Sequence, residues 1–288
     1  MKKQVIVTGA SGQLGQELLV AVDPSSNPDF DFIFLSREVL SLDDSQSIRA
    51  LFETHRPAYC INCAAYTAVD KAESEKETAF RINGDAVGDL AAICKEFNTR
   101  LLHISTDYVF DGQSAIPLKE QDPTGPLNVY GASKLRGEQL ALERQPDTVI
   151  LRTSWVYSEF GNNFVRTMMR LMKEKESIRV VADQVGSPTY AADLAAVILK
   201  IVEGSSFIPG IYHYSNEGAI SWYQFALTIK ELTRSSCRVE PIPTAQYPTP
   251  ARRPHYSLLD KTLIRRIYGI QVPDWKDSLV SCLARIPG

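Results

Sequence analysis

The sequence contains few of the residues that mark disulfide-bonded, metal-bound or membrane-spanning proteins. Its 288 residues include five cysteines, an odd number that disfavours a disulfide framework. No stretch approaches the ~18–20 consecutive apolar residues of a membrane span. Scattered histidines are usually structural or surface residues, and no metal-ligand spacing relates the four that are present, His55, His103, His213 and His255.

The sequence also lacks a run of basic residues, and its net charge is only −3. This balance argues against nucleic acid or an anionic membrane as the main partner. The first residues, MKKQVIVTGASG, carry two lysines and a short apolar run. That run breaks at Thr8-Gly9, too early for a signal peptide. We therefore expect a cytoplasmic protein.

One cysteine pair, Cys60 and Cys63, has the C-x-x-C spacing of redox and metal sites. A redox pair works at the N-terminus of a helix, where the dipole lowers the thiol pKa. Here the pair lies in AYCINCAA, which is typical of a buried strand. On a strand, residues three apart face opposite sides at about 10 Å, beyond the ~7 Å limit for a disulfide. The pattern disfavours a redox or metal role.

The first half of the chain alternates apolar strands with helices. Gly, Asn or Asp residues separate the segments, and in the helices apolar residues recur every three or four positions. The expected strands span residues 4–9, 31–36, 58–65, 100–110 and 148–157. The expected helices span residues 13–22, 47–55, 77–98 and 134–145. This order predicts an α/β fold with a doubly wound parallel sheet covered on both faces.

The rhythm changes after about residue 157, where irregular segments become longer. We expect residues 1–157 to form an NAD(P)-binding Rossmann domain. Residues 158–288 should form mostly a smaller C-terminal substrate-binding domain, with segments around 191–215 returning to the Rossmann sheet. The Pro-rich segment 241–254 resembles a stiff lid.

A glycine-rich turn, TGASGQLGQ, follows the first strand and opens the first helix. Its glycines, Gly9, Gly12 and Gly15, allow a tight turn and a close approach to a pyrophosphate. The helix N-terminus adds N–H groups and a positive dipole end. A dinucleotide cofactor is therefore predicted.

The second strand ends at Ser36-Arg37, where a carboxylate would bind a ribose 2′-hydroxyl and repel a 2′-phosphate. A hydroxyl and a guanidinium suit a 2′-phosphate instead. We therefore predict NADPH over NADH. Glu38 stands next in the chain, so NADH stays possible, and an alternative is that Arg37 is merely solvated.

Polar side chains at the end of the fourth strand and a following helix form the candidate catalytic group. Thr106 ends the strand, and Tyr130 and Lys134 share one helix face four residues apart. A free Tyr has a pKa near ~10, and a nearby Lys cation should lower it toward the operating pH. This arrangement predicts reduction of a carbonyl, with Tyr130 as proton donor and Thr106 orienting the oxygen.

Several sequence blocks together resemble the dTDP-4-dehydrorhamnose reductase family, within the extended short-chain dehydrogenases/reductases. The resemblance covers the chain from the first strand to about residue 260. The narrowest signals are NCAAYTAVDKAE and STDYVFDG, which accompany TGASGQLG, PLNVYGASKLRGE, RTSWVY, DQVGSPTY, IYHYSNEGAISWYQFA and RRP. The resemblance implies reduction of the 4-keto group of dTDP-4-dehydro-L-rhamnose, the last step of dTDP-L-rhamnose synthesis for cell-wall polysaccharide.

The resemblance also implies roles for single residues. Thr106, Tyr130 and Lys134 match the catalytic triad of the family, and Tyr130 and Lys134 also face the cofactor. Further cofactor contacts are implied for Gly12, Gln13, Leu14, Ala64, Ala65, Tyr66 and Thr67. Contacts with the sugar are implied for Val69, Asp107, Tyr108 and Trp155. Weaker candidates for the nucleotide end are Asn163, Gln184, Arg253 and Ser257.

The chain departs from the family pattern in two places. Ser41-Leu42 stands where members often carry an Asp near the adenine. Some members form a metal-linked dimer through acidic residues; Glu17 matches one, but Ala192 stands at another. We therefore expect no structural metal, and a monomer or weak homodimer.

Two other functions are compatible with the same residues. A nucleotide-sugar epimerase or dehydratase shares the turn and the Tyr/Lys pair; dehydratases tend to place acidic residues beside the catalytic Thr, and Asp107 is followed by Tyr108. The regulatory subunit of methionine adenosyltransferase resembles the same family and acts as a binding partner. The blocks around Trp155 and SWYQFA favour the enzyme.

Overall fold

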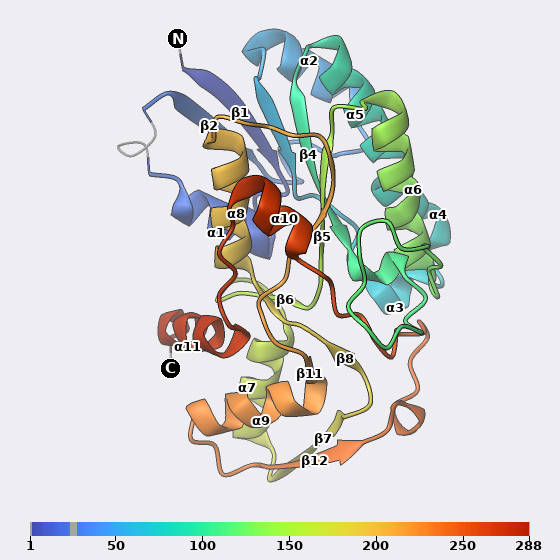
Figure 1. Cartoon of the computed structure of the whole chain (residues 1–288), viewed down its shortest axis with the longest axis vertical. Coiled ribbons are helices and arrows are strands. Elements are labelled where there is room, and N and C mark those ends of the chain that lie inside the picture. The colour runs from blue at the N-terminus through green and yellow to red at the C-terminus, as the bar shows by residue number, and fades with distance from the viewer. Residues whose placement is uncertain (1, 24–27, 288) are drawn as a thin grey trace.

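The computed structural model describes residues 2–23 and 28–287, and its centre is one six-stranded parallel sheet (Figure 1). The strands, in their order across the sheet, are β10 (Gly210–His213), β5 (Val149–Thr153), β4 (Arg100–Thr106), β3 (Tyr59–Asn62), β1 (Lys3–Thr8) and β2 (Phe30–Leu35). Every neighbouring pair runs parallel. The predicted α/β class with a doubly wound parallel sheet is confirmed.

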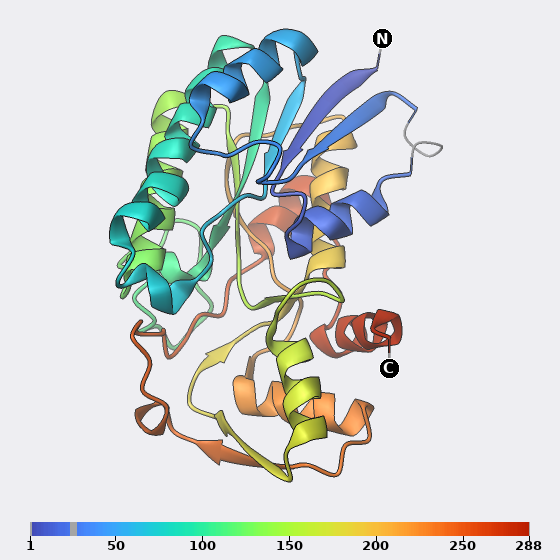
Figure 2. The same cartoon turned by 180° about the vertical axis from the view of Figure 1, so that it is seen from behind.

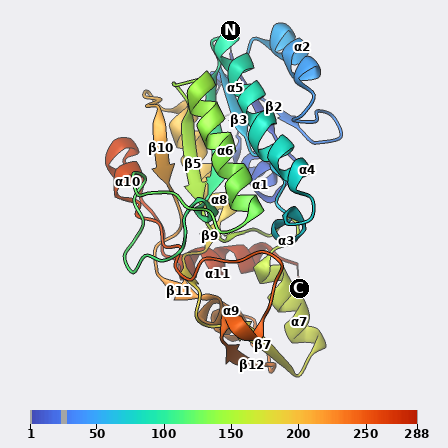
Figure 3. The same ribbon diagram turned by 90° about the vertical axis from the view of Figure 1, so that its right-hand side faces the viewer.

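Helices cover both faces of this sheet. One face carries α1 (Gln13–Ala21), α8 (Ala191–Glu203) and α10 (Thr262–Tyr268). The other carries α2 (Ser45–His55), α5 (Ala86–Glu96) and α6 (Val129–Arg144). Figure 3 shows α5 and α6 lying in front of the strands, with α8 behind them. Parallel strands covered in this way lose water on both sides, which explains their nearly continuous apolar runs.

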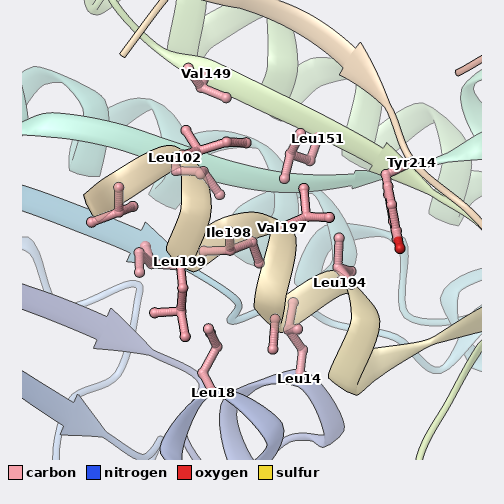
Figure 4. Packing of buried hydrophobic residues seen from close by; sticks show 14 of the residues in the cluster. Leu14, Leu18, Leu102, Val149, Leu151, Leu194, Val197, Ile198, Leu199 and Tyr214 are labelled. Atoms are coloured by element: carbon pink, nitrogen blue, oxygen red, sulfur yellow. The ribbon is translucent and has the colours of Figure 1, made fainter. Parts of the chain in front are cut away.

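The first face has the larger apolar core. Figure 4 shows α8 presenting Leu194, Ile198 and Leu199 toward the strands and toward α1. Leu18 of α1 and Leu102 of β4 are fully buried against it. Burying a side chain of this size stabilises the fold by roughly 1.5–3 kcal/mol, so this interface fixes α1 on the sheet.

The long helix expected over residues 77–98 is divided into three pieces. It contains α4 (Lys76–Phe80), a π-helical turn (Arg81–Asp85) and α5. The side chain of Asn83, inside the turn, bonds both the N–H and the C=O of Tyr66. An inserted residue of this kind is typical of functional sites. Here it holds the segment that follows β3.

Three of the expected strands end three or four residues early, and the first of them, expected to reach residue 65, stops at Asn62. The strand expected to reach residue 110 stops at Thr106, and a short 3-10 turn, Asp107–Val109, follows. The strand expected to reach residue 157 stops at Thr153 and resumes as β6 (Val156–Tyr157). Trp155 between them has a φ of 48°, a left-handed conformation that breaks the ladder. Both breaks place side chains at the sheet end.

A second, smaller region lies beyond the carboxyl ends of the strands (Figures 1 and 2). It contains the strands β7 (Ser177–Val181), β8 (Val185–Gly186), β9 (Thr189–Tyr190), β11 (Ile220–Ser221) and β12 (Arg238–Ile242). Its helices are α7 (Phe164–Glu174), α9 (Trp222–Leu232) and α11 (Trp275–Arg285). Aromatic and aliphatic side chains from these elements form a separate core around Tyr157 and Phe225. Between the two regions the chain returns to the large sheet through α8 and β10.

The remaining short helix, α3 (Val69–Ala72), and a 3-10 turn, Thr244–Gln246, lie near the junction. The turn belongs to the Pro-rich segment, which is tied to the rest of the molecule by Asp70 and Asn128. Within residues 2–23 and 28–287, none of the helices combines the length and the apolar character that crossing a bilayer requires.

Candidate functional site

The glycine turn at the end of β1 is shaped by its missing side chains. Gly9 has a φ of 71°, and a Cβ there would lie 2.7 Å from the backbone N of Ala64. A Cβ on Gly15 would lie 2.3 Å from the carbonyl oxygen of Gly9. Gly12 occupies the N-cap of α1 and offers no side-chain hydrogen bond to its first N–H groups. The open helix N-terminus and this glycine cradle fit a pyrophosphate.

The turn opens into a cavity of about 640 Å³ at the carboxyl ends of the strands. It lies where β2 and β3 leave β1 in opposite directions, the usual ligand position in such sheets. Most of the sequence-predicted site residues line it: Gly9, Gly12, Gln13, Leu14, Gly15, Arg37, Ser41, Leu42, Ala64, Ala65, Tyr66, Thr67, Val69, Thr106, Asp107, Tyr108, Tyr130, Lys134 and Trp155.

Five predicted residues stand outside the lining of this cavity. Ser36 lies beside Arg37 but does not reach the wall. Asn163 caps α7 and donates to the side-chain oxygen of Gln13 at 3.0 Å, so it supports the turn. Ser257 is buried, and its hydroxyl lowers the pKa of Asp107.

The other two, Gln184 and Arg253, line a separate hollow of about 420 Å³. Arg253 is engaged there in a two-bond ion pair with Asp70. The hollow is bounded by the Pro-rich segment, including Tyr247.

The first turn of α6 carries the Tyr/Lys pair. Asn128 caps the helix by accepting from the N–H of Gly131 at 2.8 Å. A Cβ on Gly131 would lie 2.1 Å from the carbonyl oxygen of Tyr108, so the helix start is pressed against the end of β4. Lys134 is 2 % exposed, and its Nζ donates to the carbonyl of Ile104 at 2.7 Å.

The expectation that Lys134 lowers the pKa of Tyr130 is wrong for this structure. Burial raises the pKa of Tyr130 to about 12, against a lowering effect from the Thr106 hydroxyl. Burial lowers the pKa of Lys134 to about 8. The Lys134 amine is directed to the carbonyl of Ile104, so desolvation rather than its charge dominates at Tyr130. Tyr130 therefore keeps its proton at neutral pH.

Thr106 and Asp107 lie beside Tyr130 on the cavity wall. The Thr106 hydroxyl donates to Asp107 at 3.0 Å and accepts from the N–H of Tyr108. Burial raises the pKa of Asp107 to about 6, opposed by the hydroxyls of Ser257 and Thr106. Tyr108 packs edge-on against Tyr130, with ring centroids 5.7 Å apart. The part of the cavity around Tyr130 thus combines hydroxyl groups with one carboxyl group, that of Asp107.

An aromatic wall closes the far end of the cavity. The indole of Trp155 stacks on that of Trp222, with ring centroids 3.5 Å apart. A Cβ on Gly186 would lie 2.8 Å from the Trp155 ring, so the backbone of β8 supports it from behind. The two indoles give this part of the cavity an apolar lining, which suits the apolar side of a sugar.

The rim near β2 carries a small charged cluster. Arg37 is exposed and lies on the cavity wall. Asp43, also on the wall, pairs with Arg81 at 3.1 Å and accepts from Ser41 at 2.5 Å. The Ser41 hydroxyl, with smaller effects of Arg81 and Arg37, lowers the pKa of Asp43.

Several lining residues were not predicted from the sequence. The aromatic partner Trp222 lies in the quoted SWYQFA block, but nothing in that block indicates which ring faces the site. Cys63 lies on the wall, and burial raises the pKa of its thiol, contrary to the needs of a redox pair. The others are Ser11, Leu40, Asp43, Ile82, Ile104, Thr153, Ser154, Val156, Gly161, Asn162 and Leu194.

Acidic residues do cluster at one place outside the cavity. Glu17 of α1 is 1 % exposed and accepts from Ser158, and Arg285 of α11 approaches both Glu17 and Glu159. Across the part of the chain that the structure describes, no group of three or more His, Cys, Asp or Glu side chains is arranged to hold a metal ion.

A glycine turn at β1–α1 and a Tyr/Lys pair at the sheet end define an oxidoreductase that uses a nicotinamide dinucleotide. Residues 2–287 match the family described as the RmlD substrate binding domain. The chain therefore belongs to the dTDP-4-dehydrorhamnose reductase family.

Individual relatives agree over nearly the whole chain. The dTDP-4-dehydrorhamnose reductase of Aggregatibacter actinomycetemcomitans is 42% identical over 287 residues, covering 96% of this chain and 97% of the relative. The dTDP-4-keto-6-deoxy-D-glucose reductase of Streptomyces niveus is 37% identical, covering 97% and 96%. The crystal structure of dTDP-4-dehydrorhamnose reductase from Bacillus anthracis, in complex with NADP, has a TM-score of 0.94 at 39% identity, covering 99% of each chain.

Proposed function

We propose that this protein reduces the 4-keto group of dTDP-4-dehydro-L-rhamnose to give dTDP-L-rhamnose, with NADPH as the reductant. One observation carries the proposal: Thr106, Tyr130 and Lys134 line the same cavity as the glycine turn. The family membership supports the same reaction. A nicotinamide nucleotide, when bound, supplies a hydride to the keto carbon. The residues of the chain then have to bind both ligands, orient the keto group and protonate its oxygen.

Tyr130 is the proposed proton donor. Burial holds its pKa at about 12, so the phenol carries its proton at neutral pH and can release it as the ketone oxygen gains charge. Thr106, whose hydroxyl affects that pKa by hydrogen bonding, is placed to orient the same oxygen. Lys134, deeper in the cavity, would bind the nicotinamide ribose and return a proton to Tyr130.

The cofactor's phosphates are proposed to bind at the N-terminus of α1. Gln13 and Leu14 offer N–H groups there, Gly12 has no side chain to block the approach, and Asn163 fixes the Gln13 side chain. Arg37 is exposed on the rim and suits a 2′-phosphate through paired hydrogen bonds. The NADP in the Bacillus anthracis relative supports NADPH. NADH stays possible because Asp43 brings negative charge to the same rim and Glu38 follows Arg37 in the chain.

The substrate is proposed to span the junction of the two regions. Its deoxysugar would rest on Trp155, between Tyr108 and Val69. Its diphosphate and base would extend toward the hollow lined by Gln184 and Arg253. The ring of Tyr247 suits the base, and the guanidinium of Arg253, although paired with Asp70, adds hydrogen-bond donors near the diphosphate.

The Streptomyces niveus relative favours a second candidate, a 4-keto-6-deoxyglucose nucleotide as substrate. The two sugars differ only in configuration. Tyr130 would protonate the 4-keto oxygen of either one. An epimerase and a non-catalytic binding subunit are further alternatives, which predict no net oxidation of NADPH.

The assembly of the protein and its cellular location are proposed as well. We propose a monomer or weak homodimer, because Ala192 stands where members with a metal-linked dimer carry an acidic residue. All five cysteines are free thiols, as in proteins of a reducing compartment, and we propose the cytoplasm.

A spectrophotometric assay tests the proposal. Purified protein, NADPH and dTDP-4-dehydro-L-rhamnose are mixed, and the absorbance of the reduced nicotinamide is followed. Turnover with this sugar at least tenfold faster than with dTDP-4-keto-6-deoxy-D-glucose is expected, since the pocket contacts discriminate by roughly 1–3 kcal/mol. Binding of NADPH without turnover on either sugar contradicts the proposal.

A further inference from the structure

Three buried polar side chains form a ladder beneath the catalytic pair. Thr8, Asn62 and His103 are register partners on the adjacent strands β1, β3 and β4. Each is at most 4 % exposed. The Thr8 hydroxyl donates to Asn62 Oδ1 at 2.7 Å, and Asn62 Nδ2 lies 3.0 Å from His103 Nδ1. His103 Nε2 lies 3.3 Å from Nζ of Lys134, where the ladder ends.

A backbone group fixes the direction of this ladder. The N–H of Ala64 donates to Asn62 Oδ1 at 3.2 Å, and this oxygen also accepts from Thr8. Turning the Asn62 amide over would place its NH₂ group against the Ala64 N–H, two donors face to face. The amide therefore presents its NH₂ group to His103, and His103 Nδ1 must accept.

The imidazole of His103 then has only one arrangement of protons. It is fully buried, and burial together with the charge of Lys134 holds its pKa well below the ordinary value, so the ring is neutral. A neutral ring that accepts at Nδ1 carries its proton at Nε2. That N–H is directed at Nζ of Lys134. An ammonium group cannot accept it, whereas a neutral amine has the lone pair that can.

We propose that the Thr8–Asn62–His103 ladder positions Nζ of Lys134 by a contact with His103 Nε2. The same contact makes the Lys134 ammonium easier to deprotonate. The inference rests on the proposed function, because Lys134 acts there beside Tyr130. His103 touches neither substrate nor cofactor in this account; it acts through Lys134. The ladder readies Lys134 to give up a proton after Tyr130 has used its own.

The other groups that face Lys134 do not reverse this effect. Glu138 lies one turn further along α6 and raises the pKa of Lys134, as does Cys63 after β3. Both oxygens of Glu138 are engaged by the buried Arg152, and Ser105 donates to it as well. Much of its charge is thereby compensated. The carbonyl of Ile104 accepts from Nζ in either protonation state.

The tautomer of His103 is the first test, and it requires no turnover. The protein is labelled with ¹⁵N in its histidine rings, and the ring nitrogen shifts are measured by NMR, with His103→Gln assigning the signal. The ladder predicts a neutral ring protonated at Nε2. Asn62→Asp, which replaces the donor with an acceptor, should switch the proton to Nδ1. A wild-type ring that is protonated at Nδ1, or charged, overturns the proposal.

The pH profile is the second test. Reduction needs the Lys134 ammonium, so kcat/KM should fall as pH rises through the pKa of Lys134. In His103→Gln, the amide oxygen can accept from the ammonium, and this alkaline limb should move up by about one pH unit, a tenfold change in proton affinity. His55→Gln, a histidine on α2 away from the cavity, should leave the limb in place.

An unmoved limb in an active His103→Gln enzyme contradicts the proposal, because a merely structural histidine would change the rate without changing its pH dependence. If the wild type carries the predicted tautomer but reduces no sugar, the proposed function fails while the ladder stands. The two failures are therefore distinguishable.

Discussion

Tyr130 works in an environment that opposes its ionisation. Burial and the nearby carboxyl of Asp107 both raise its pKa, and the value of about 12 keeps the phenol protonated. Reduction of a ketone consumes a proton, so the protonated form is the useful one. Proton transfer therefore depends on a phenol that holds its proton until charge develops on the substrate oxygen.

Replacing this phenol removes the proton and little else. Tyr130→Phe should lower kcat by ~10²–10⁴, the usual contribution of a positioned acid. NADPH affinity should change little, because the ring and Lys134 remain. Steady-state kinetics and fluorescence titration of NADPH measure the two quantities. A Tyr130→Phe enzyme with full kcat would show that another group protonates the ketone.

Arg37 gives the corresponding test for the cofactor. Arg37→Ala should raise KM for NADPH by about tenfold or more and leave KM for NADH nearly unchanged, because only NADPH carries the 2′-phosphate. Arg170→Ala removes an exposed arginine of α7 and serves as the control. An unaltered preference for NADPH in Arg37→Ala assigns Arg37 to the solvated surface.

At this scale the sequence predicts those residues whose role follows from position along the chain. Gly9 follows a strand, Thr106 ends one, and Tyr130 and Lys134 share a helix face. His103 was interpreted as a structural or surface residue, because its contact with Lys134 depends on the register of β3 with β4 and on where α6 lies. Contacts of that kind have no signature in one sequence.

At the scale of elements, hydrogen bonds connect the Pro-rich segment to α3 and α6, which belong to the region that contains the large sheet. Arg253 and the N–H of Ala251 both bond the carboxylate of Asp70 on α3. Asn128, the cap of α6, donates to the carbonyl of Arg252. The catalytic helix and the segment beside the second hollow are therefore connected directly.

Removing this fastening should loosen the segment without unfolding the protein. In Asp70→Ala, hydrogen exchange at the amide of Ala251 should quicken by at least tenfold, since its acceptor is gone. Overall stability should fall by no more than about 1 kcal/mol, because the ion pair is partly exposed. Asp89→Ala breaks another exposed pair, with Arg144, as the control. Unchanged exchange at Ala251 means that Asp70 does not hold the segment.

The order and type of the elements were predictable where apolar periodicity is strong, as in α1, α2 and β1 to β5. The places where these strands and helices are interrupted were not predictable. The left-handed Trp155 ends a run that looks continuous in TVILRTSWVY, because its stacking on Trp222 and the support of Gly186 come from distant segments. The π-helical turn at Asn83 depends in the same way on hydrogen bonds to Tyr66.

At the scale of the whole molecule, a buried carboxyl group links three distant parts. Glu17 of α1 contacts Ser158, Glu159 and Arg285, so it joins the cofactor-side helix to the C-terminal helix. Burial, and then a hydrogen bond with Glu159, raises the pKa of Glu17 from 4.5 to about 8. The native state therefore binds one more proton than the unfolded chain between those values.

This link predicts a stability that falls as the pH rises. The contribution of Glu17 is complete below pH 4.5 and is lost progressively up to about pH 8. Glu17→Gln keeps an oxygen for Ser158 and needs no proton, so it should gain on the order of 1–2 kcal/mol over the wild type as the pH rises through this window. Urea unfolding at several pH values measures the difference. A difference that stays constant with pH refutes the raised pKa.

The whole molecule also carries the central claim, hydride transfer to a 4-keto sugar in the cavity between its two regions. The most direct measurement uses NADPH with deuterium at the transferred position of the nicotinamide ring, and dTDP-4-dehydro-L-rhamnose as substrate. The product is isolated, and its deuterium is located by NMR and mass spectrometry. We expect one deuterium at C4 of dTDP-L-rhamnose in the wild type. A product without deuterium at C4, or none formed while NADPH binds, contradicts it.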